Sequence, residues 1–495
     1  MTFTDYVFEN SCKLNKTAVI DKIEISYEEI YQGIKYITNL LRCKDYGKHD
    51  SVLIISENSL FFIKTYFGII KNGSICVPIN PSISTEDIKY IIQSLNIKLI
   101  FAQERYKKKI KDIIKEDVDL YTEKDLNGLK YIKKIEIRND IDLKDDTALI
   151  MFTSGSTDKP KGVMLTHYNL VCNTDSIIKY LKLTEKDRVE VVLPFYYCYG
   201  TSLLNTHFRC GGSIVINNRF MFPQTVLDHI NKYKCTGFAG VPSTYQILLR
   251  MTNMKELKFP SLRYVTQAGG RLPEVFISEL SSILNETDIY IMYGQTEDTA
   301  RLSYLPPSKL KSKLGSIGKG IPGTKLMVVN KEGLEVKTGE IGEIVAQGGN
   351  IMKGYFNDES ETKKALKNGV LHTGDIGKID DDGYIYIVSR EKNIIKSAGN
   401  RISPKEIENV IVEINEVVEC AVIGVEDDIL GEAIKAFVVL KSNSTNINSK
   451  YIIDYCRDRL PNFKVPKYVE FLITLPKNSS GKVLLKSLKN REKMK

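Results

Sequence analysis

The sequence predicts an α/β fold: a large N-terminal domain of layered α/β subdomains that ends in a β-rich subdomain, followed by a small α+β domain. Three observations predict it. Short apolar runs alternate with stretches of helical spacing up to about residue 300, glycine-rich hairpin sequences follow residue 310, and a new helical pattern begins at Ser403. At 495 residues the chain also exceeds what one hydrophobic core usually supports, so several domains are expected.

The apolar runs of the first part are expected to be strands of mainly parallel sheets. Each run is short, bounded by turn-forming residues, and separated from the next by mixed polar and apolar sequence of helical spacing. This alternation is typical of α/β layers. The runs are 51–56, 74–78, 147–152, 188–194, 213–217, 236–241 and 288–293.

The sequence pattern changes after residue 310. Residues 338–343 and 380–384 are rich in glycine and acidic residues, as in hairpin turns, and predict the β-rich subdomain. The segment 403–411 predicts a helix, because Ser403 can cap it, Pro404 suits its first turn and Glu406 completes a capping box. A compact domain of about 100 residues is expected to follow.

Composition excludes several classes of function. The net charge is +9, but 70 Lys and Arg stand against 61 acidic residues and the lysines are scattered, so we expect no nucleic-acid partner. Nine cysteines, without a Cys-x-x-Cys pair, argue against a disulfide framework and a zinc site and favour a reducing cytoplasm. No signal peptide and no run of about 18 apolar residues is present, so secretion and a membrane span are not expected.

The loop 153–162 contains four hydroxyl side chains, two glycines and two lysines, directly after a predicted strand. Hydroxyls, bare backbone amides and lysine charges all suit phosphate oxygens. The Walker pattern does not fit, since Gly155 and Gly162 are seven residues apart and Val163 follows, which disfavours a P-loop kinase or GTPase. A surface loop without a ligand is the plainer alternative.

Four further blocks occur along the chain. They are 293–297 (Tyr-Gly-Gln-Thr-Glu), 372–375 (His-Thr-Gly-Asp) with its partner 389–396, 396–404 and 476–483. Taken singly, each has a plainer interpretation: the start of a helix, a turn, a solvated linker or a surface lysine. Their order and spacing carry more weight than any one of them.

Together these blocks resemble the adenylate-forming superfamily, which includes acyl- and aryl-CoA ligases, adenylation domains of peptide synthetases and firefly-type luciferases. The resemblance covers nearly the whole chain. It implies that ATP activates a carboxylic acid as its acyl-adenylate. It also implies that Glu297 holds Mg²⁺, a hard cation that prefers carboxylate oxygen.

The resemblance further implies nucleotide-binding roles for residues of the N-terminal domain. Thr296 contacts phosphate, Tyr293 stacks on adenine, and Asp375 and Arg390 bind the ribose. The expected nucleotide-binding residues are Thr153, Ser154, Gly155, Ser156, Thr157, Lys161, Gly269, Gly270, Arg271, Tyr293, Gly294, Gln295, Asp375 and Arg390.

The resemblance implies a mobile C-terminal domain that rotates between the two half-reactions. It places an N-terminal domain at 1–389, a hinge at 390–393 with Lys392 at the hinge position, and a C-terminal domain at 394–495. Lys482 is expected to bridge the substrate carboxylate and the α-phosphate in the first step. The face that begins at Lys396 is expected to be presented in the thioester step.

The acid is expected to be fatty or aromatic. Residues 194–200 resemble a ligase motif but have Tyr197 where many CoA ligases have His, which leaves the gating role of that His in doubt. Amino-acid-activating domains place an Asp near this segment, and none occurs between Arg188 and Asp228. Core packing is the alternative for each aromatic among the expected pocket residues, which are Tyr196, Tyr197, Phe238, Val241 and Gly269.

The acyl acceptor is expected to be the thiol of coenzyme A, in a cytoplasmic enzyme of fatty acid metabolism. The alternative is an acyl- or amino-acid-AMP ligase that loads the phosphopantetheine of a carrier protein. Luciferase-like oxidation and a non-catalytic scaffold are two further hypotheses. The intact set Glu297, Asp375, Arg390 and Lys482 argues against the scaffold.

Overall fold

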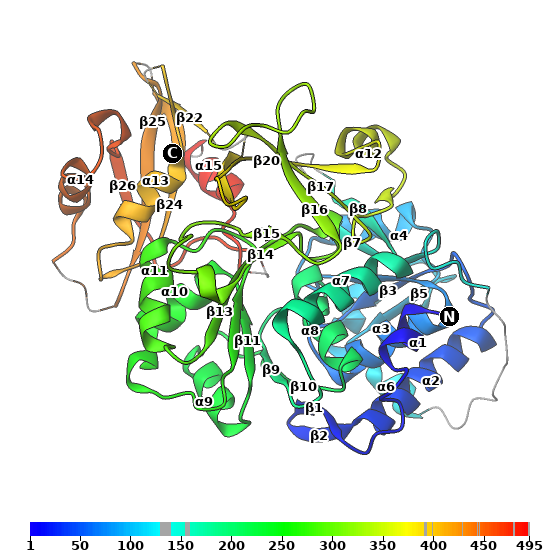
Figure 1. Cartoon of the computed structure of the whole chain (residues 1–495). Coiled ribbons are helices and arrows are strands. Elements are labelled where there is room, and N and C mark those ends of the chain that lie inside the picture. Colours follow the sequence, from blue (N-terminus) through cyan, green and yellow to red (C-terminus); the bar gives the residue numbers. More distant parts are fainter. Residues whose placement is uncertain are drawn as a thin grey trace.

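The computed structural model describes residues 1–128, 140–153, 159–390, 394–397, 399–427, 429–442, 444, 446–478 and 481–493. It confirms the predicted α/β class, with a large N-terminal part and a small C-terminal domain (Figure 1). None of the helices found in these residues is long and apolar enough to cross a membrane.

The first sheet has nine strands in the order β15-β14-β13-β12-β11-β9-β10-β1-β2. The six strands from β13 to β1 are parallel, as the apolar runs predict, and antiparallel strands close both edges. Its strands are β1 Thr17–Asp21, β2 Ile23–Ser26, β9 Arg188–Val191, β10 Ser213–Ile216, β11 Gly237–Gly240, β12 Tyr264–Gln267, β13 Asp288–Tyr293, β14 Ser303–Leu305 and β15 Lys319–Gly320.

The second sheet has seven strands in the order β18-β8-β7-β4-β3-β5-β6. Strand β8 pairs antiparallel with β7 on the far side of the predicted phosphate loop, a pairing that the sequence pattern did not reveal. The strands are β3 Ser51–Ile55, β4 Ile75–Ile79, β5 Leu99–Ala102, β6 Asp119–Tyr121, β7 Thr147–Thr153, β8 Lys161–Thr166 and β18 Gly354–Tyr355.

Helices cover the faces of both sheets. One hydrophobic core contains residues of the first-sheet strands together with buried residues of α2, α3, α7 and α8, while α9, α10 and α11 pack on the other face of the first sheet. Helix α4 packs on the outer face of the second sheet. The helices of this part are α1 Phe3–Val7, α2 Tyr27–Cys43, α3 Leu60–Asn72, α4 Thr85–Ser94, α5 Lys107–Lys111, α6 Glu123–Gly128, α7 His167–Leu181, α8 Cys198–Arg209, α9 Gln224–Lys232, α10 Pro242–Met251, α11 Glu274–Ile283 and α12 Glu359–Ala365.

The predicted β-rich subdomain is present as an antiparallel sheet. Strands β16, β17, β20 and β19 follow one another, and β21 pairs with β20. The predicted hairpin turn at 380–384 joins β20 and β21. The strands are β16 Thr324–Val329, β17 Ile341–Gly348, β19 Leu366–Lys367, β20 Val370–Ile379 and β21 Ile385–Arg390.

The C-terminal domain, orange to red in Figure 1, is built on a sheet of order β23-β22-β25-β24, with β26 on β25. Buried residues of β24 and β25 form a core with Leu475 and Leu488, against which Ile247 of α10 packs. The C-terminal domain therefore lies against the N-terminal part. Its elements are β22 Ile395–Ser397, β23 Asn400–Ile402, α13 Pro404–Ile411, β24 Val417–Asp427, β25 Gly431–Leu440, α14 Ser449–Arg457, β26 Tyr468–Phe471 and α15 Leu485–Lys493.

The helix predicted from Ser403 exists as α13, with Pro404 in its first turn. The predicted capping box is wrong, because the Ser403 side chain makes no capping hydrogen bond. The Glu406 carboxylate instead forms an ion pair with Lys464. The Glu406 carboxylate therefore pairs with Lys464, which is distant in sequence, and not with the backbone at the start of the helix.

Candidate active site

The carboxyl ends of the parallel strands gather the predicted residues at one edge of the first sheet. Val241 follows β11, Gly269 and Gly270 follow β12, and Tyr293 ends β13. Neighbouring parallel strands end on the same side, and ligands of open α/β sheets bind at that edge. The shared edge therefore explains why segments more than 50 residues apart meet.

A hydrogen-bonded cluster joins two of the predicted motifs. The Tyr293 hydroxyl donates to Asp375 Oδ2 at 2.7 Å, and Gln295 Nε2 donates to the same oxygen at 3.0 Å. Gln295 also donates to the Thr373 carbonyl oxygen at 3.0 Å. Burial, and secondarily the Asp375 carboxylate, raises the pKa of Tyr293 well above its usual value, so this phenol stays protonated as a donor.

Asp375 lies within β20 and is buried, and its backbone pairs with Arg390 of β21. The register therefore brings together the two residues that the resemblance assigns to the ribose. Residues 391–393, which include the predicted hinge residue Lys392, lie outside the described part of the chain. The predicted domain boundaries remain a prediction.

Glu297 lies in the short helical turn after β13 and is half-buried. Its Oε1 accepts a hydrogen bond of 2.9 Å from the Tyr355 hydroxyl of β18. Tyr355 is a residue that sequence reasoning missed, because it belongs to none of the motif blocks. Burial and the nearby Glu297 raise its pKa, so the hydroxyl remains a donor to the carboxylate.

The phosphate loop is described only at its two ends. Thr153 ends β7 and Lys161 begins β8, whereas Ser154, Gly155, Ser156 and Thr157 lie outside the described residues. Lys161 forms an ion pair with Glu361 of α12, and its ammonium lies 5.5 Å from the centre of the Tyr355 ring. The hydrogen bond from Lys161 is the main cause that lowers the pKa of Glu361 to about 2.

These contacts connect the phosphate loop to the predicted metal ligand through Tyr355. No group of three or more His, Cys, Asp or Glu side chains that could hold a metal occurs within the described ranges. A lone carboxylate such as Glu297 still fits Mg²⁺, which is usually held by one or two carboxylates, waters and substrate phosphates.

The loop after β12 approaches its neighbours closely. Gly269 has φ of +86°, and a Cβ there would lie 3.1 Å from Cγ1 of Val241. Gln267 Nε2 donates to the Gly270 carbonyl oxygen at 2.7 Å, which fixes the turn. Arg271 pairs with Glu274 at 2.8 Å. The two glycines thus present bare backbone at the edge where the resemblance expects adenine.

The loop that carries Lys482 rests on the N-terminal domain. The Ser243 hydroxyl of α10 donates to the Gly481 carbonyl oxygen at 2.8 Å. Gly481 has φ of +80°, and a Cβ there would lie 3.0 Å from Cγ2 of Val241. Since Val241 also faces Gly269, one side chain lies between the loop of Gly269 and the loop of Lys482.

Lys482 itself is exposed, and its backbone amide donates to Asn478 Oδ1 at 2.9 Å. Lys396 is exposed on β22, where its backbone amide donates to Glu432 at 2.6 Å. The structure therefore brings the Lys482 loop, through Gly481, against α10 of the N-terminal domain.

The expected acyl-pocket residues are only partly brought together. Tyr196 and Tyr197 have ring centres 5.0 Å apart and belong, with Val241, to the core around α7 and α8. Phe238 lies in the other core and packs edge-on against Tyr245, with ring centres 5.8 Å apart. Alternate residues of β11 face opposite sides of the sheet, so Phe238 is a core residue there and we leave it out of the pocket proposed below.

Helix α8 begins directly after Tyr197, and Gly200 in its first turn packs closely against the preceding backbone. A Cβ at Gly200 would lie 2.0 Å from the Pro194 carbonyl oxygen, much closer than any real contact. In the first turn of α8, Cys198 Sγ lies 3.7 Å from the Thr296 hydroxyl. Burial raises the pKa of Cys198 to about 11, so the thiol remains neutral and is no nucleophile.

We expect Gly200→Ala to lower the free energy of unfolding by about 1–3 kcal/mol, because the added methyl overpacks the turn before α8. The measurement is urea denaturation followed by circular dichroism. Gly47→Ala is the matched control, since nothing lies within 4 Å of a Cβ at that position. A variant at Gly200 as stable as the control would contradict the predicted clash.

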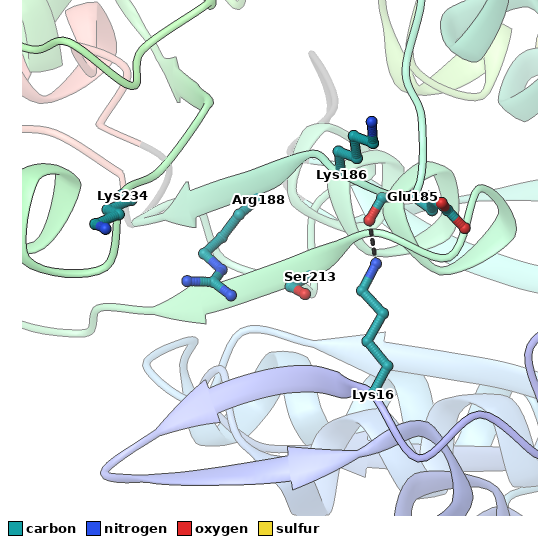
Figure 2. A pocket seen from close by; sticks show the side chains of 6 residues that line it. All are labelled: Lys16, Glu185, Lys186, Arg188, Ser213 and Lys234. Carbon is teal, nitrogen blue, oxygen red and sulfur yellow. Dashed lines mark hydrogen bonds between the residues drawn. The ribbon is translucent and has the colours of Figure 1, made fainter.

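An open pocket of about 470 Å³ lies elsewhere, at the amino ends of the strands (Figure 2). Arg188 and Ser213 begin β9 and β10, and Lys16 precedes β1. Lys16 binds the carbonyl oxygens of Glu185 and Gly211, and Arg188 binds that of Tyr233, so backbone oxygens already satisfy these two cations in part. None of the motif residues lies there, and we assign it no role in the reaction.

The motif geometry can be compared with known proteins. The family model of AMP-binding enzymes matches residues 8–356, and the model of the AMP-binding enzyme C-terminal domain matches residues 406–482. The chain belongs to this family. The resemblance drawn from the motifs is therefore confirmed, and with it the class of enzyme, an AMP-forming acid–CoA ligase.

Relatives of this AMP-binding enzyme align over nearly its whole length. It is 30% identical over 470 residues to a 2-succinylbenzoate–CoA ligase of Bacillus subtilis, covering 95% of this chain and 93% of that protein. It is 29% identical to a long-chain-fatty-acid–CoA ligase of the same species, covering 95% and 90%. The solved o-succinylbenzoate coenzyme A synthetase of Bacillus subtilis with ATP and magnesium ion has a TM-score of 0.86 at 28% identity and covers 99% of each chain.

Proposed function

We propose that this AMP-binding enzyme joins a carboxylic acid to the thiol of coenzyme A in two steps. The observation that carries the proposal is the contact of Gly481 with Ser243 and Val241. It places the loop of Lys482 beside Gly269, at the same sheet edge as the Tyr293 and Asp375 cluster. This arrangement supports a site to which both domains contribute.

In the first step a carboxylate oxygen attacks the α-phosphorus of ATP, and the bond to the pyrophosphate oxygen breaks. We propose that Lys482 lies between the two approaching anions and neutralises charge that increases toward the transition state. Mg²⁺, held by Glu297, would screen the repulsion between the phosphates and the incoming carboxylate. Thr153, Lys161 and the intervening loop would hold the phosphates that leave as pyrophosphate.

In the second step the thiol sulfur attacks the acyl carbon, its proton is lost, and AMP leaves with the bonding electrons of the acyl–oxygen bond. We propose that the C-terminal domain turns about 390–393 between the steps, which withdraws Lys482 and presents the face of Lys396. Asp375 and Arg390 would keep the ribose in place during both steps.

We propose a pocket for the acid formed by Tyr196, Tyr197, Val241 and Gly269. The first three share one core, and the side chain of Val241 faces Gly269. Aromatic walls suit fatty and aromatic acids alike. The relatives named above act on a succinylbenzoate and on long-chain fatty acids, which agrees with a pocket whose lining varies between members.

The test of this proposal is exchange of labelled pyrophosphate into ATP in the presence of single acids, followed by mass spectrometry of the products with coenzyme A. We expect acid-dependent exchange and an acyl-CoA. Exchange without transfer to coenzyme A, but with transfer to a phosphopantetheinyl carrier protein, would overturn the acceptor and keep the adenylation. ATP binding without any acid-dependent exchange would indicate a non-catalytic protein, and light emission with added luciferin an oxidase.

We expect Ser243→Ala to slow adenylate formation about 3–10-fold, because one neutral hydrogen bond to Gly481 contributes about 0.5–1.5 kcal/mol. Thioester formation from supplied acyl-adenylate should change less than 2-fold, which follows from the proposed withdrawal of the loop in that step. Adenylate formation is measured by pyrophosphate exchange, and thioester formation by release of AMP from the supplied acyl-adenylate. A larger effect on the thioester step would contradict the proposed closed arrangement.

A further inference from the structure

The open pocket of Figure 2 lies at the edge of the first sheet opposite the candidate active site. Strands β11, β9, β10 and β1 are neighbours in this order and run parallel, so their amino ends share that edge. The volume of about 470 Å³ is within the range of about 300–1,000 Å³ that is usual for sites of small ligands. The lining residues are Lys16, Glu185, Lys186, Arg188, Ser213 and Lys234.

The lining of this pocket has an excess of positive charge. Four of its residues are cations, and only Glu185 is an acid. None of the four cations forms an ion pair with a carboxylate of the described residues. The Glu185 carboxylate points away from Lys16 in Figure 2. Asp187, which is buried nearby in the sequence, is bound instead by Arg263 at 2.9 Å and by the Thr236 hydroxyl at 2.8 Å.

Backbone oxygens fix two of the cations in place without neutralising them. Lys16 Nζ donates to the carbonyl oxygens of Glu185 and Gly211, the second at 2.7 Å, and Arg188 Nη1 donates to that of Tyr233 at 2.7 Å. A carbonyl group carries no net charge, and the guanidinium has further N–H donors. Burial is the main cause that lowers the pKa of Lys16, and the charge of Arg188 adds to it, whereas Glu185 counteracts both. An anion beside these side chains would therefore stabilise their charged forms.

The cations form a row along the ends of the strands. The Ser213 hydroxyl of β10 donates to the Thr17 carbonyl oxygen of β1 at 2.6 Å, directly after Lys16. Arg188 of β9 lies between Lys234 and Lys16 (Figure 2). Neighbouring strands are about 4.8 Å apart, so the three spacings from β11 to β1 place the ends of the row about 14 Å apart. One phosphate group is too small to contact the whole row, whereas two linked phosphates extend along it.

We propose that this pocket binds a small molecule that carries a diphosphate group. The planar guanidinium of Arg188 suits two phosphate oxygens at once, and the lysine ammonium groups supply point charges on either side. A diphosphate carries two or more negative charges at neutral pH, which matches the excess of cations better than a single carboxylate does. Inorganic pyrophosphate and the diphosphate of a nucleotide share this chemistry. The site goes beyond the proposed function, which uses the opposite edge of the sheet.

The experiment measures how fast an acetylating reagent modifies individual lysines of the full-length enzyme, by mass spectrometry of its peptides. Inorganic pyrophosphate, ADP, inorganic phosphate or sulfate is added at equal ionic strength and without Mg²⁺. At ten times its dissociation constant a diphosphate should slow the modification of Lys16 and Lys234 about 10-fold, because only the free pocket reacts. Lys331, which is exposed between β16 and β17, is the internal control and should react at an unchanged rate.

The variant Arg188→Met keeps most of the side-chain length but removes the charge. We expect it to weaken the affinity for the diphosphate about 10-fold, the usual scale of a lost hydrogen bond between charged groups. Acid-dependent pyrophosphate exchange should stay within about 2-fold of the wild-type rate, because the two sites are distant and independent. The matched control is Arg219→Met, which removes an exposed arginine beyond the carboxyl end of β10 and should keep the protection.

The proposal is overturned if neither diphosphate protects Lys16 and Lys234, if sulfate or phosphate protects them equally well, or if Arg188→Met keeps the full affinity. Should Arg188→Met fail to fold, Lys234→Gln on the surface gives the same test, read at Lys16. Stronger protection by pyrophosphate identifies the free anion as the source, and stronger protection by ADP a nucleotide, and either result supports the site. Protection without exchange for any acid would overturn the proposed function and leave this site standing.

Discussion

Lys482→Ala should lower the rate of acyl-adenylate formation about 10²–10³-fold, the usual effect of removing a group that stabilises developing charge. The lysine loop contacts the N-terminal domain through Gly481, Ser243 and Val241, so its side chain starts from the edge where ATP is expected. The block 476–483 contains one further lysine, Lys477. Its ammonium group is already paired with the Glu419 carboxylate at 2.6 Å, so Lys482 is the candidate for this role.

The two half-reactions separate this role from a general loss of structure. Thioester formation from supplied acyl-adenylate and coenzyme A should remain within about 3-fold of the wild-type rate, since the proposed rotation withdraws Lys482 in that step. Lys489→Ala is the control, because it removes an exposed lysine of α15 near the same end of the chain. Equal losses in both half-reactions would contradict the proposed rotation of the C-terminal domain.

Glu297→Gln should lower adenylation on the order of 100-fold and move half-saturation by Mg²⁺ to higher concentration. The substitution keeps the shape of the side chain and its contact with Tyr355, but it removes the negative charge that a hard cation prefers. The measurement is pyrophosphate exchange as a function of Mg²⁺ at saturating ATP.

Tyr355→Phe is the companion variant, because it leaves the Glu297 carboxylate and removes only its hydrogen-bond donor. Groups that orient a metal ligand typically contribute 10–100-fold, so we expect an effect near the lower end, about 10-fold. If Glu297→Gln leaves the Mg²⁺ dependence unchanged, Glu297 is not the metal ligand. If Tyr355→Phe has the larger effect, the tyrosine has a role that we have not assigned.

The sequence by itself determined the fold class, and it supplied the site residues that we propose. The predicted parallel strands are present almost residue for residue, as at 51–55 and 288–293, because short apolar runs between turn formers leave few other structures. The motif blocks predicted one site that contains Glu297, Asp375 and Lys482. That prediction depended on residue types and their order, which sequence carries directly.

Only the tertiary structure decided which residues share a face and which charges are paired. Both faces of β11 are buried, so its apolar residues do not indicate which face each side chain occupies. Only the structure shows that Phe238 packs with Tyr245 in one core, whereas Tyr196 lies in the other. The Glu406 carboxylate forms an ion pair with Lys464 instead of the predicted capping box. The Tyr355 hydroxyl donates a hydrogen bond to Glu297, which lies 58 residues earlier in the chain. Such facts arise from contacts distant in the chain, whose geometry is set by packing rather than by local sequence.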